Sequence, residues 1–281
     1  MMSKVSKGTV LFDNILIEDD FDLEKMINSG QCFRPAKISD DTYRFITGQH
    51  EVKIRDISAS RRKKSDRNVT ELEISCSRKE WDEVWHDYFD LDTNYRKIRE
   101  SIPKDDAYLR RAAEFGRGIR ILRQDKFEML VSFIISQRKS IPAIRTSVER
   151  IVDLYGHDGF FPNPSDMLRA TYDELSACGL GYRVPYIMKA VERVAHHDID
   201  LDALDDLSDE ELFDKLKSFA GVGDKVANCV ELFAYHRTGR APVDTWIARV
   251  IADQYGGVNP FPRYGDVAGI MQQYMFYSSI K

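Results

Sequence analysis

Cysteine is scarce in this sequence. The 281 residues include four cysteines, Cys32, Cys76, Cys178 and Cys229, and no two of them form a Cys-x-x-Cys pair. Zinc sites and iron–sulfur clusters commonly use such closely spaced pairs. We therefore expect no metal site and no metal or redox cofactor. Isolated thiols in a chain of this size are also typical of a reducing compartment.

Long apolar runs are missing as well. No stretch approaches the ~20 apolar residues that cross a membrane. The first residues, Met1-Met2-Ser3-Lys4, lack the apolar run of a secretion signal. We expect a cytoplasmic protein that makes no membrane contact.

The sequence also has no excess of basic residues. Lys and Arg number 41 against 46 Asp and Glu, which gives a formal net charge of -5. The charge of the whole chain therefore gives no sign of a polyanionic partner, although a local basic face is enough to bind phosphates. Hydrophobic residues make up 43% of the chain. A chain of this length and composition buries a real core, as one or two domains.

Short runs of alternating polar and apolar residues in the first hundred positions predict β-strands. These runs are Tyr43–Thr47, Glu51–Arg55 and Val69–Cys76. The basic run 61–68 lies between the last two, and we favour a solvated hairpin loop over a phosphate contact for it.

From about Glu80 the apolar residues recur three and four positions apart, which predicts helices. The predicted helices are Trp81–Leu91, Tyr95–Ile102, Phe127–Ile135, Ile141–Tyr155 and Pro185–Val194. The two patterns together predict an α+β fold. We place an antiparallel sheet domain over residues 1–104 and an all-helical domain over residues 105–281.

Segment 216–227 is the most informative of the chain and reads Leu-Lys-Ser-Phe-Ala-Gly-Val-Gly-Asp-Lys-Val-Ala. We expect one helix to end near Phe219, a very tight turn whose positive φ angles Gly221 and Gly223 permit, and a second helix from Asp224. Backbone N–H groups at such a turn, with Val222 between the glycines, can hold a phosphate oxygen. The alternative is a plain helix corner in the core. A nucleotide P-loop is excluded because its GxxxxGK[ST] spacing is absent.

Lys225 falls in the first turn of the second predicted helix, where the helix dipole disfavours a cation. The dipole and burial there would favour the neutral amine, which is the nucleophilic form. Asp244 follows nineteen residues later, just before another helical pattern. Its carboxylate would cap that helix and could also face a developing positive charge. A surface lysine and a structural cap are the plainer interpretations of the two residues.

The hairpin at about residues 212–232, followed by Pro242-Val243-Asp244, resembles the hairpin and catalytic aspartate of the helix–hairpin–helix DNA glycosylases. A lysine in the hairpin's second helix marks the branch that also cleaves the strand. Further segments resemble, in order and from about residue 12 to the C-terminus, the 8-oxoguanine DNA glycosylases. They are Ser29–Arg34, Leu122–Asp125, Phe133–Ser136, Leu180–Arg183 and Ala268–Phe276.

The resemblance implies roles at the damaged nucleotide. Lys225 would attack the sugar C1′ and form a Schiff base, and Asp244 would stabilise the positive charge on the sugar. Cys229 would pack close to the lysine ammonium. Beside Cys229, the base-binding residues would be Gly30, whose carbonyl accepts the N7 proton of 8-oxoguanine, Gln272, which reads the Watson–Crick edge, and Phe276, which stacks on the base. Without the resemblance, Gln272 and Phe276 are only an i,i+4 pair on a helix.

The resemblance also implies contacts to the rest of the duplex. Tyr182 would wedge into the gap that the extruded base leaves, and Arg183 would hydrogen-bond the orphan cytosine. Gly221, Val222 and Gly223 would hold a phosphate through the hairpin backbone.

The sequence departs from the family at four places. Arg138-Lys139-Ser140 stands where the vertebrate-type enzymes carry three asparagines, and Ala143 stands where an arginine that reads the orphan base is expected. These two departures put opposite-base discrimination in doubt, and Arg138 is kept as a candidate DNA contact. Trp246 replaces a phosphate-contacting histidine, and Pro35 replaces a tryptophan. Trp246 is a second candidate contact, although we favour a core aromatic there.

We therefore predict a monomeric, bifunctional glycosylase that excises 8-oxoguanine from double-stranded DNA and cleaves the strand by β-elimination, associated with the nucleoid if the source is prokaryotic. One alternative is a glycosylase for alkylated purines, which normally lacks the hairpin lysine. The other is a non-catalytic hairpin module that only binds DNA.

Overall fold

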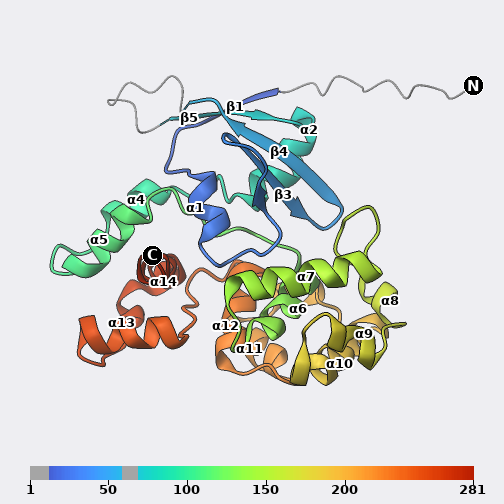
Figure 1. Cartoon of the computed structure of the whole chain (residues 1–281). Helices are drawn as coiled ribbons and strands as arrows, with labels where there is room; N and C mark the ends of the chain where they lie inside the picture. Colours follow the sequence, from blue (N-terminus) through green and yellow to red (C-terminus); the bar gives the residue numbers. More distant parts are fainter. Residues whose placement is uncertain (1–12, 59–68) are drawn as a thin grey trace, which may run out of the picture.

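The computed structural model describes residues 13–58 and 69–281, so the basic run 61–68 lies outside the described residues. Five antiparallel strands form one sheet in the order β1-β5-β4-β3-β2. Figure 1 shows this sheet as a layer above the helices. The strands are β1 (Asp13–Ile17), β2 (Ala36–Lys37), β3 (Thr42–Thr47), β4 (His50–Asp56) and β5 (Thr70–Ile74).

The alternation seen in the sequence is what buries one face of this sheet. Phe45 pairs with Val52 and Ile54 pairs with Ile74, and all four side chains are fully buried. Helix α1 (Leu23–Asn28) adds its apolar residues to the same cluster. The three predicted strands are therefore confirmed as β3, β4 and β5, each within about two residues of its predicted ends.

The helix predicted over residues 81–91 is broken into three pieces. They are α2 (Arg78–Glu80), a π-helical turn η1 (Trp81–Trp85) and α3 (His86–Tyr88). A π turn is wider than an α turn, and here it carries Trp81 and Trp85, both buried against the sheet. The helix stops before Leu91 because Asp90 takes a left-handed φ of 51°.

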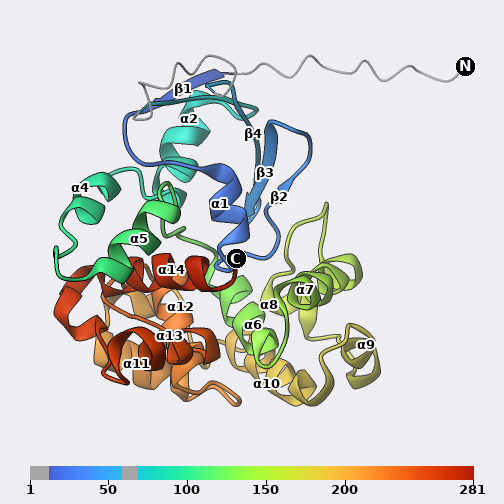
Figure 2. The ribbon, with the colours of Figure 1, turned by 60° about the vertical axis from the view of Figure 1, so that its left-hand side comes forward.

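Helices make up the rest of the chain (Figures 1 and 2). Helix α7 has the bounds that the sequence predicts, and α4, α6 and α10 differ from prediction by one or two residues at an end. The full set is α4 (Tyr95–Glu100), α5 (Ala107–Phe115), α6 (Lys126–Ser136), α7 (Ile141–Tyr155), α8 (Pro164–Met167), α9 (Tyr172–Ala177), η2 (Gly181–Arg183), α10 (Val184–Ala195), η3 (Ala203–Asp206), α11 (Asp209–Lys217), α12 (Asp224–Phe233), α13 (Thr245–Tyr255), η4 (Phe261–Val267) and α14 (Ala268–Ser279). The predicted α+β class is confirmed.

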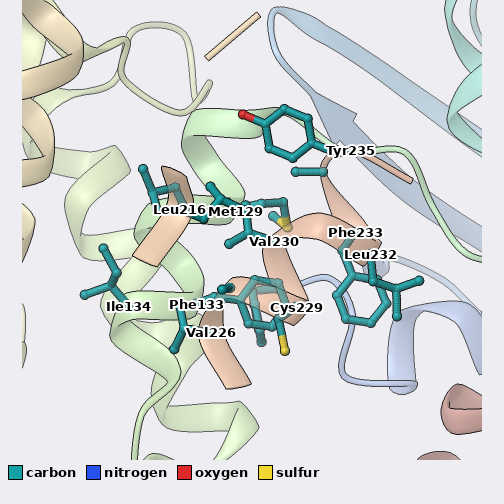
Figure 3. Close-up of a cluster of buried hydrophobic side chains, with 14 of the residues drawn as sticks. Met129, Phe133, Ile134, Leu216, Val226, Cys229, Val230, Leu232, Phe233 and Tyr235 are labelled. Atoms are coloured by element: carbon teal, nitrogen blue, oxygen red, sulfur yellow. The ribbon is translucent and has the colours of Figure 1, made fainter. Parts of the chain in front are cut away.

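Helix α6 is the central element of this helical part. Every residue from Phe127 to Ser136 is buried, because α7, α10 and α12 all pack against this helix. Figure 3 shows α6 and α12 meeting through Met129, Phe133, Cys229 and Val230. A helix buried on all sides is held firmly, so its C-terminal residue, Ser136, has a fixed place next to α12.

The two parts of the fold interlock at two places. Phe33, in the loop after α1, joins the helical core, and Leu122 joins the core under the sheet. Helix α14 packs against α5 and lies between α5 and α12 in Figure 2. A division at residue 104 stays a prediction. Within the described ranges, no helix has both the length and the apolar character needed to cross a membrane.

Candidate active site

A small pocket lies where α6, α12 and α14 meet the loop that follows α1. Its cavity volume is about 40 Å³. The residues that line it are Gly30, Phe133, Lys225, Cys229, Phe233, Pro242, Asp244, Gln272, Gln273 and Phe276. All six residues that the sequence predicts at the sugar or the base are therefore brought to one place.

Lys225 is held at the wall of this pocket by α6. Its Nζ donates a hydrogen bond to Ser136 Oγ at 3.3 Å and lies 5.2 Å from the centre of the Phe133 ring. The Ser136 hydroxyl donates its own hydrogen bond to the Phe133 carbonyl, so its oxygen lone pairs can accept a hydrogen bond from the amine. The amine is half-buried and has a fixed direction, which is what a nucleophile in a pocket requires.

Cys229 lies one turn after Lys225 on α12 and is 97% buried. Burial raises the pKa of its thiol, and the charge of Lys225 and a hydrogen bond with it act in the opposite direction. Its predicted place beside the lysine is therefore observed. The buried thiol is a packing group for this pocket and not a reactive thiolate.

Asp244 caps helix α13. Its Oδ1 accepts hydrogen bonds from the N–H groups of Trp246, at 3.1 Å, and Ile247, at 2.9 Å. Both bonds go to the same oxygen, so Oδ2 remains outside the capping interaction. One carboxylate can therefore hold the helix end and also present an oxygen to a positive charge in the pocket.

Gly30 and Phe276 close the pocket against each other. Gly30 takes a positive φ of 79°, and a Cβ atom placed on it would lie 2.7 Å from Phe276 Cε1. Only glycine permits this approach. Because the Phe276 ring packs directly on Gly30, it has to move before a base can enter between the two.

Two glutamines of α14 behave differently at the pocket. Gln273 donates to the Ser29 carbonyl at 2.6 Å and so fixes the loop that carries Gly30. Gln272 is also buried, but its Oε1 has no hydrogen-bond partner within the described residues. A buried polar atom without a partner is costly and calls for an explanation such as a ligand.

The hairpin between α11 and α12 is formed as the sequence predicts. Gly221 has a φ of 80°, and a Cβ there would lie 2.4 Å from the Tyr186 ring, whereas Gly223 has a φ of -100° and open space around it. Of the two glycines that permit a positive φ angle, only Gly221 takes one, because one left-handed residue suffices to turn the chain. Val222 is buried, so only its backbone can meet a phosphate.

Tyr182 and Arg183, in the turn η2, lie very differently. Tyr182 is exposed, as a wedge must be. Arg183 is buried, with its guanidinium bonded to the carbonyl oxygens of Gln137 and Leu180. Contact with an orphan base would require Arg183 to leave these carbonyls, and its role in reading that base stays a prediction.

The loop after α6 carries the residues that replace the family's asparagines. Arg138 is exposed and has a left-handed φ of 50°. Lys139 donates to the Gly179 carbonyl at 2.8 Å and to Ser147 Oγ, and so ties this loop to the turn that bears Tyr182. Burial, together with the charges of Arg183 and Arg150, lowers the pKa of Lys139.

Trp246 is not a core aromatic, contrary to our preferred interpretation. Its side chain is 43% exposed, and the Arg249 guanidinium lies 5.6 Å from its ring centre. The buried face of α13 consists of Ile247, Val250 and Ile251, which turns Trp246 outward near Asp244. It remains a candidate DNA contact.

Ser136, Gln137 and Gln273 were not predicted as site residues. Ser136 closes a segment that the resemblance uses, which was the one available signal for it. Gln273 and Gln137 act through carbonyls of distant segments, and sequence spacing does not reveal such contacts. In the described part of the chain, no three His, Cys, Asp or Glu side chains gather as metal ligands do.

Two family models match adjoining parts of the chain. Residues 15–130 match "8-oxoguanine DNA glycosylase, N-terminal domain". Residues 131–274 match "HhH-GPD superfamily base excision DNA repair protein". The first match covers the sheet and the start of α6, and the second covers the hairpin, Lys225 and Asp244.

Similar proteins agree with these matches. A Methanothermobacter thermautotrophicus protein named "Probable N-glycosylase/DNA lyase" is 30% identical over 209 residues, covering 61% of this chain and 67% of that protein. MBOgg1, solved with a low affinity DNA ligand, is 31% identical with a TM-score of 0.84, covering 96% of this chain and 98% of that one. The Clostridium acetobutylicum 8-oxoguanine glycosylase/lyase, solved with double-stranded DNA containing cytosine opposite 8-oxoG, is 29% identical with a TM-score of 0.83, covering 96% and 97%. The chain belongs to the 8-oxoguanine DNA glycosylases of the HhH-GPD superfamily.

Proposed function

We propose that this chain removes 8-oxoguanine from duplex DNA and then cleaves the strand, with Lys225 as the nucleophile and Asp244 as the carboxylate that faces the sugar. One observation carries the proposal: a single pocket holds both side chains and the unpartnered Oε1 of Gln272. The family to which the chain belongs supports the same activity.

Base release needs a neutral amine and a stabilised positive charge. One proton leaves the Lys225 ammonium, with Asp244 as the acceptor, and the freed electron pair forms the Nζ–C1′ bond as the C1′–N9 bond breaks. The electron pair of the broken bond leaves with the base, which takes up a proton. Positive charge develops on the sugar during this exchange, and the Asp244 carboxylate stabilises it.

Strand cleavage uses the same amine. A further proton leaves Nζ, the sugar ring opens as its oxygen accepts a proton, and a protonated Schiff base joins Nζ to C1′. This cation makes the C2′ protons acidic, so loss of one of them expels the 3′ phosphate. Water then hydrolyses the imine and restores Lys225.

Recognition of the base rests on the loop after α1 and on α14. The carbonyls of Ser29 and Gln31 accept hydrogen bonds from Gln273 and Gln124, whereas the Gly30 carbonyl between them accepts none from the described residues. It is therefore free to accept the N7 proton, which 8-oxoguanine has and guanine lacks. Gln272 would bond the Watson–Crick edge, and the displaced Phe276 ring would stack on the base.

Borohydride trapping tests this proposal against its rivals. The wild-type protein is incubated with matched duplexes that carry 8-oxoguanine, 7-methylguanine or guanine at one position, and covalent complex and free base are both measured. We expect a covalent complex with the 8-oxoguanine duplex alone. Release of 7-methylguanine without trapping would instead identify an alkylated-purine glycosylase, and binding without release would identify a non-catalytic module.

We further propose that the enzyme acts as a monomer, because one chain supplies all ten residues of the pocket. Light scattering in the concentration range of the excision assay should give the mass of a single 32.5 kDa chain. An active species of twice that mass would overturn this proposal.

A further inference from the structure

Gln137, the residue directly after α6, contacts two functional segments at once. Its side-chain Nε2 donates to the Gly221 carbonyl at 3.0 Å and to the Ile134 carbonyl at 3.0 Å. Its own carbonyl accepts a hydrogen bond from Arg183. One residue therefore joins the end of α6, the hairpin and the turn that bears the wedge.

The neighbours of Gln137 extend this connection to the nucleophile. Ser136, the preceding residue, accepts the hydrogen bond of Lys225 Nζ. The hairpin that Gln137 holds through Gly221 leads directly into α12, which carries Lys225. The position of residue 137 thus affects the nucleophile from both sides, through Ser136 and through the hairpin.

A second contact joins the hairpin to the turn that bears Tyr182. The Tyr186 ring packs on Gly221, where a Cβ would lie 2.4 Å from it, and it makes an edge contact with Tyr182 at 6.3 Å between ring centres. The wedge turn and the hairpin therefore form one packed unit, within which Gln137 provides the polar link.

We infer that Gln137 is a positioning residue that couples readout of the orphan base by Arg183 to the placement of the hairpin and Lys225. The inference rests on the role that the sequence predicts for Arg183 and on the proposed role of Lys225. When Arg183 turns to an orphan base, it must give up the Gln137 carbonyl, because its guanidinium is buried against it. The side chain of Gln137 transmits that change to Gly221, since its amide is the polar contact between residue 137 and the hairpin.

A double-mutant cycle tests this coupling. Single-turnover excision of 8-oxoguanine opposite cytosine and opposite adenine is measured for the wild type, Gln137→Met, Arg183→Ala and the double variant. Met keeps the length of the side chain and removes the amide. We expect Gln137→Met to lower the cytosine-to-adenine rate ratio by about fivefold, the lower end of typical coupling between sites. We expect the double variant to have the ratio of Arg183→Ala, because both changes break one path.

The rate ratio compares two substrates on one protein sample, so partial unfolding of a variant does not change it. Gln254→Met, on the exposed side of α13, makes the same chemical change elsewhere and should leave the ratio at the wild-type value. Lys139→Met cuts the neighbouring tie to Gly179 without touching the hairpin and should move the ratio by less than about twofold.

Three outcomes would overturn the inference. If Gln137→Met slows excision equally opposite both bases, Gln137 only supports the fold. If Lys139→Met lowers the ratio as much as Gln137→Met does, general loosening of the loop is responsible. If Arg183→Ala leaves the ratio unchanged, Arg183 does not read the orphan base. That result differs from additive effects of the two variants, in which both residues change the ratio but do so independently of each other.

Discussion

Lys225 Nζ lies 3.3 Å from Ser136 Oγ, and this contact joins the hairpin helix to α6, which is buried from Phe127 to Ser136. A lysine side chain has four rotatable bonds and on a surface would sample many positions. Here the hydroxyl and the Phe133 ring fix its end. The amine is therefore placed before any substrate arrives, which lowers the entropic part of the barrier to attack.

Replacement of the nucleophile gives the most direct prediction. Lys225→Gln removes the amine and preserves most of the side-chain volume. We expect base release and borohydride trapping to vanish while binding to a duplex with an abasic analogue stays close to that of the wild type, because the change deletes the amine in the pocket and leaves the hairpin backbone and the other candidate duplex contacts in place. Retained trapping would mean that another amine carries out the chemistry.

Asp244→Asn separates catalysis from helix capping. Asparagine caps a helix about as well as aspartate, so the melting temperature should stay close to that of the wild type. The charge that faces the sugar is lost, and we expect the single-turnover rate to fall by roughly 10²–10³, as for other lost electrostatic stabilisers. A variant that keeps both its rate and its stability would show that Asp244 is only a cap.

Phe276→Ala and Gln272→Ala probe the base pocket. Loss of base–aromatic stacking weakens binding by ~1–3 kcal/mol, and this loss should occur only when a base occupies the pocket. We expect each variant to lose affinity for an 8-oxoguanine duplex and to keep its affinity for an abasic-analogue duplex. Equal losses on both duplexes would assign the two residues a purely structural role.

The apolar pattern predicted the fold well where a segment contributes one continuous face. Helix α7 has its predicted bounds because its fifteen residues repeat the buried face over several turns. The pattern did less well for Trp246, a large aromatic inside an apolar helix, because the inward face is set by Ile247, Val250 and Ile251. A shift of one residue along the helix, from Trp246 to Ile247, turns a side chain from the solvent to the core.

The site was predictable only where its residues carry a local signal. Gly221, Lys225 and Asp244 stand in one recognisable hairpin and cap. The burial of Arg183 was not predictable, because its partner, the Gln137 carbonyl, comes from a loop 46 residues earlier. Backbone acceptors are present at every position, so a sequence does not show which of them a long side chain will reach.

Glu231, on α12, predicts a dependence of stability on pH. Its carboxylate is fully buried and has no hydrogen bond among the described residues, and Arg240 Nε, 3.3 Å away, pairs with it without hydrogen-bond alignment. Burial raises the pKa of Glu231 to about 7, although the positive charges of Arg240 and Arg237 oppose this. The negative charges of Asp209 and Glu210 act in the same direction as burial.

The folded protein therefore keeps this proton up to about pH 7, whereas the unfolded chain releases it near the ordinary glutamate value. The folded state binds more protons across that window, so the free energy of unfolding should fall as the pH rises through it. Glu231→Gln should remove this contribution, which is about 3 kcal/mol. Urea unfolding at pH 5 and pH 8 checks it: the variant should gain clearly more stability over the wild type at pH 8 than at pH 5. Equal behaviour at both pH values would contradict the prediction.

The last prediction concerns the base opposite the lesion. Ala143 has no donor where the family has an arginine. Arg138 stands in place of an asparagine. It is exposed, and its backbone is in the left-handed region. Its cationic fork suits guanine or phosphate better than the edge of cytosine. Arg183 is left as the reader that the chain keeps, and in the free protein it is bonded to carbonyls that it must release. Discrimination in favour of cytosine should therefore be weaker than in the asparagine-bearing enzymes.

The assay is single-turnover excision of 8-oxoguanine paired with each of the four bases, for the wild type and Arg138→Ala. Each good base contact contributes only ~1–3 kcal/mol of discrimination. With the contacts of the asparagine and of the arginine at position 143 missing, the remaining preference for cytosine should be what Arg183 alone can supply. Arg138→Ala should slow excision opposite all four bases alike, because a contact with a phosphate does not depend on which base is opposite the lesion. Strict dependence on cytosine in the wild type would defeat the prediction. Its loss in Arg138→Ala would show that Arg138 had taken over the reading that the missing asparagine performs elsewhere.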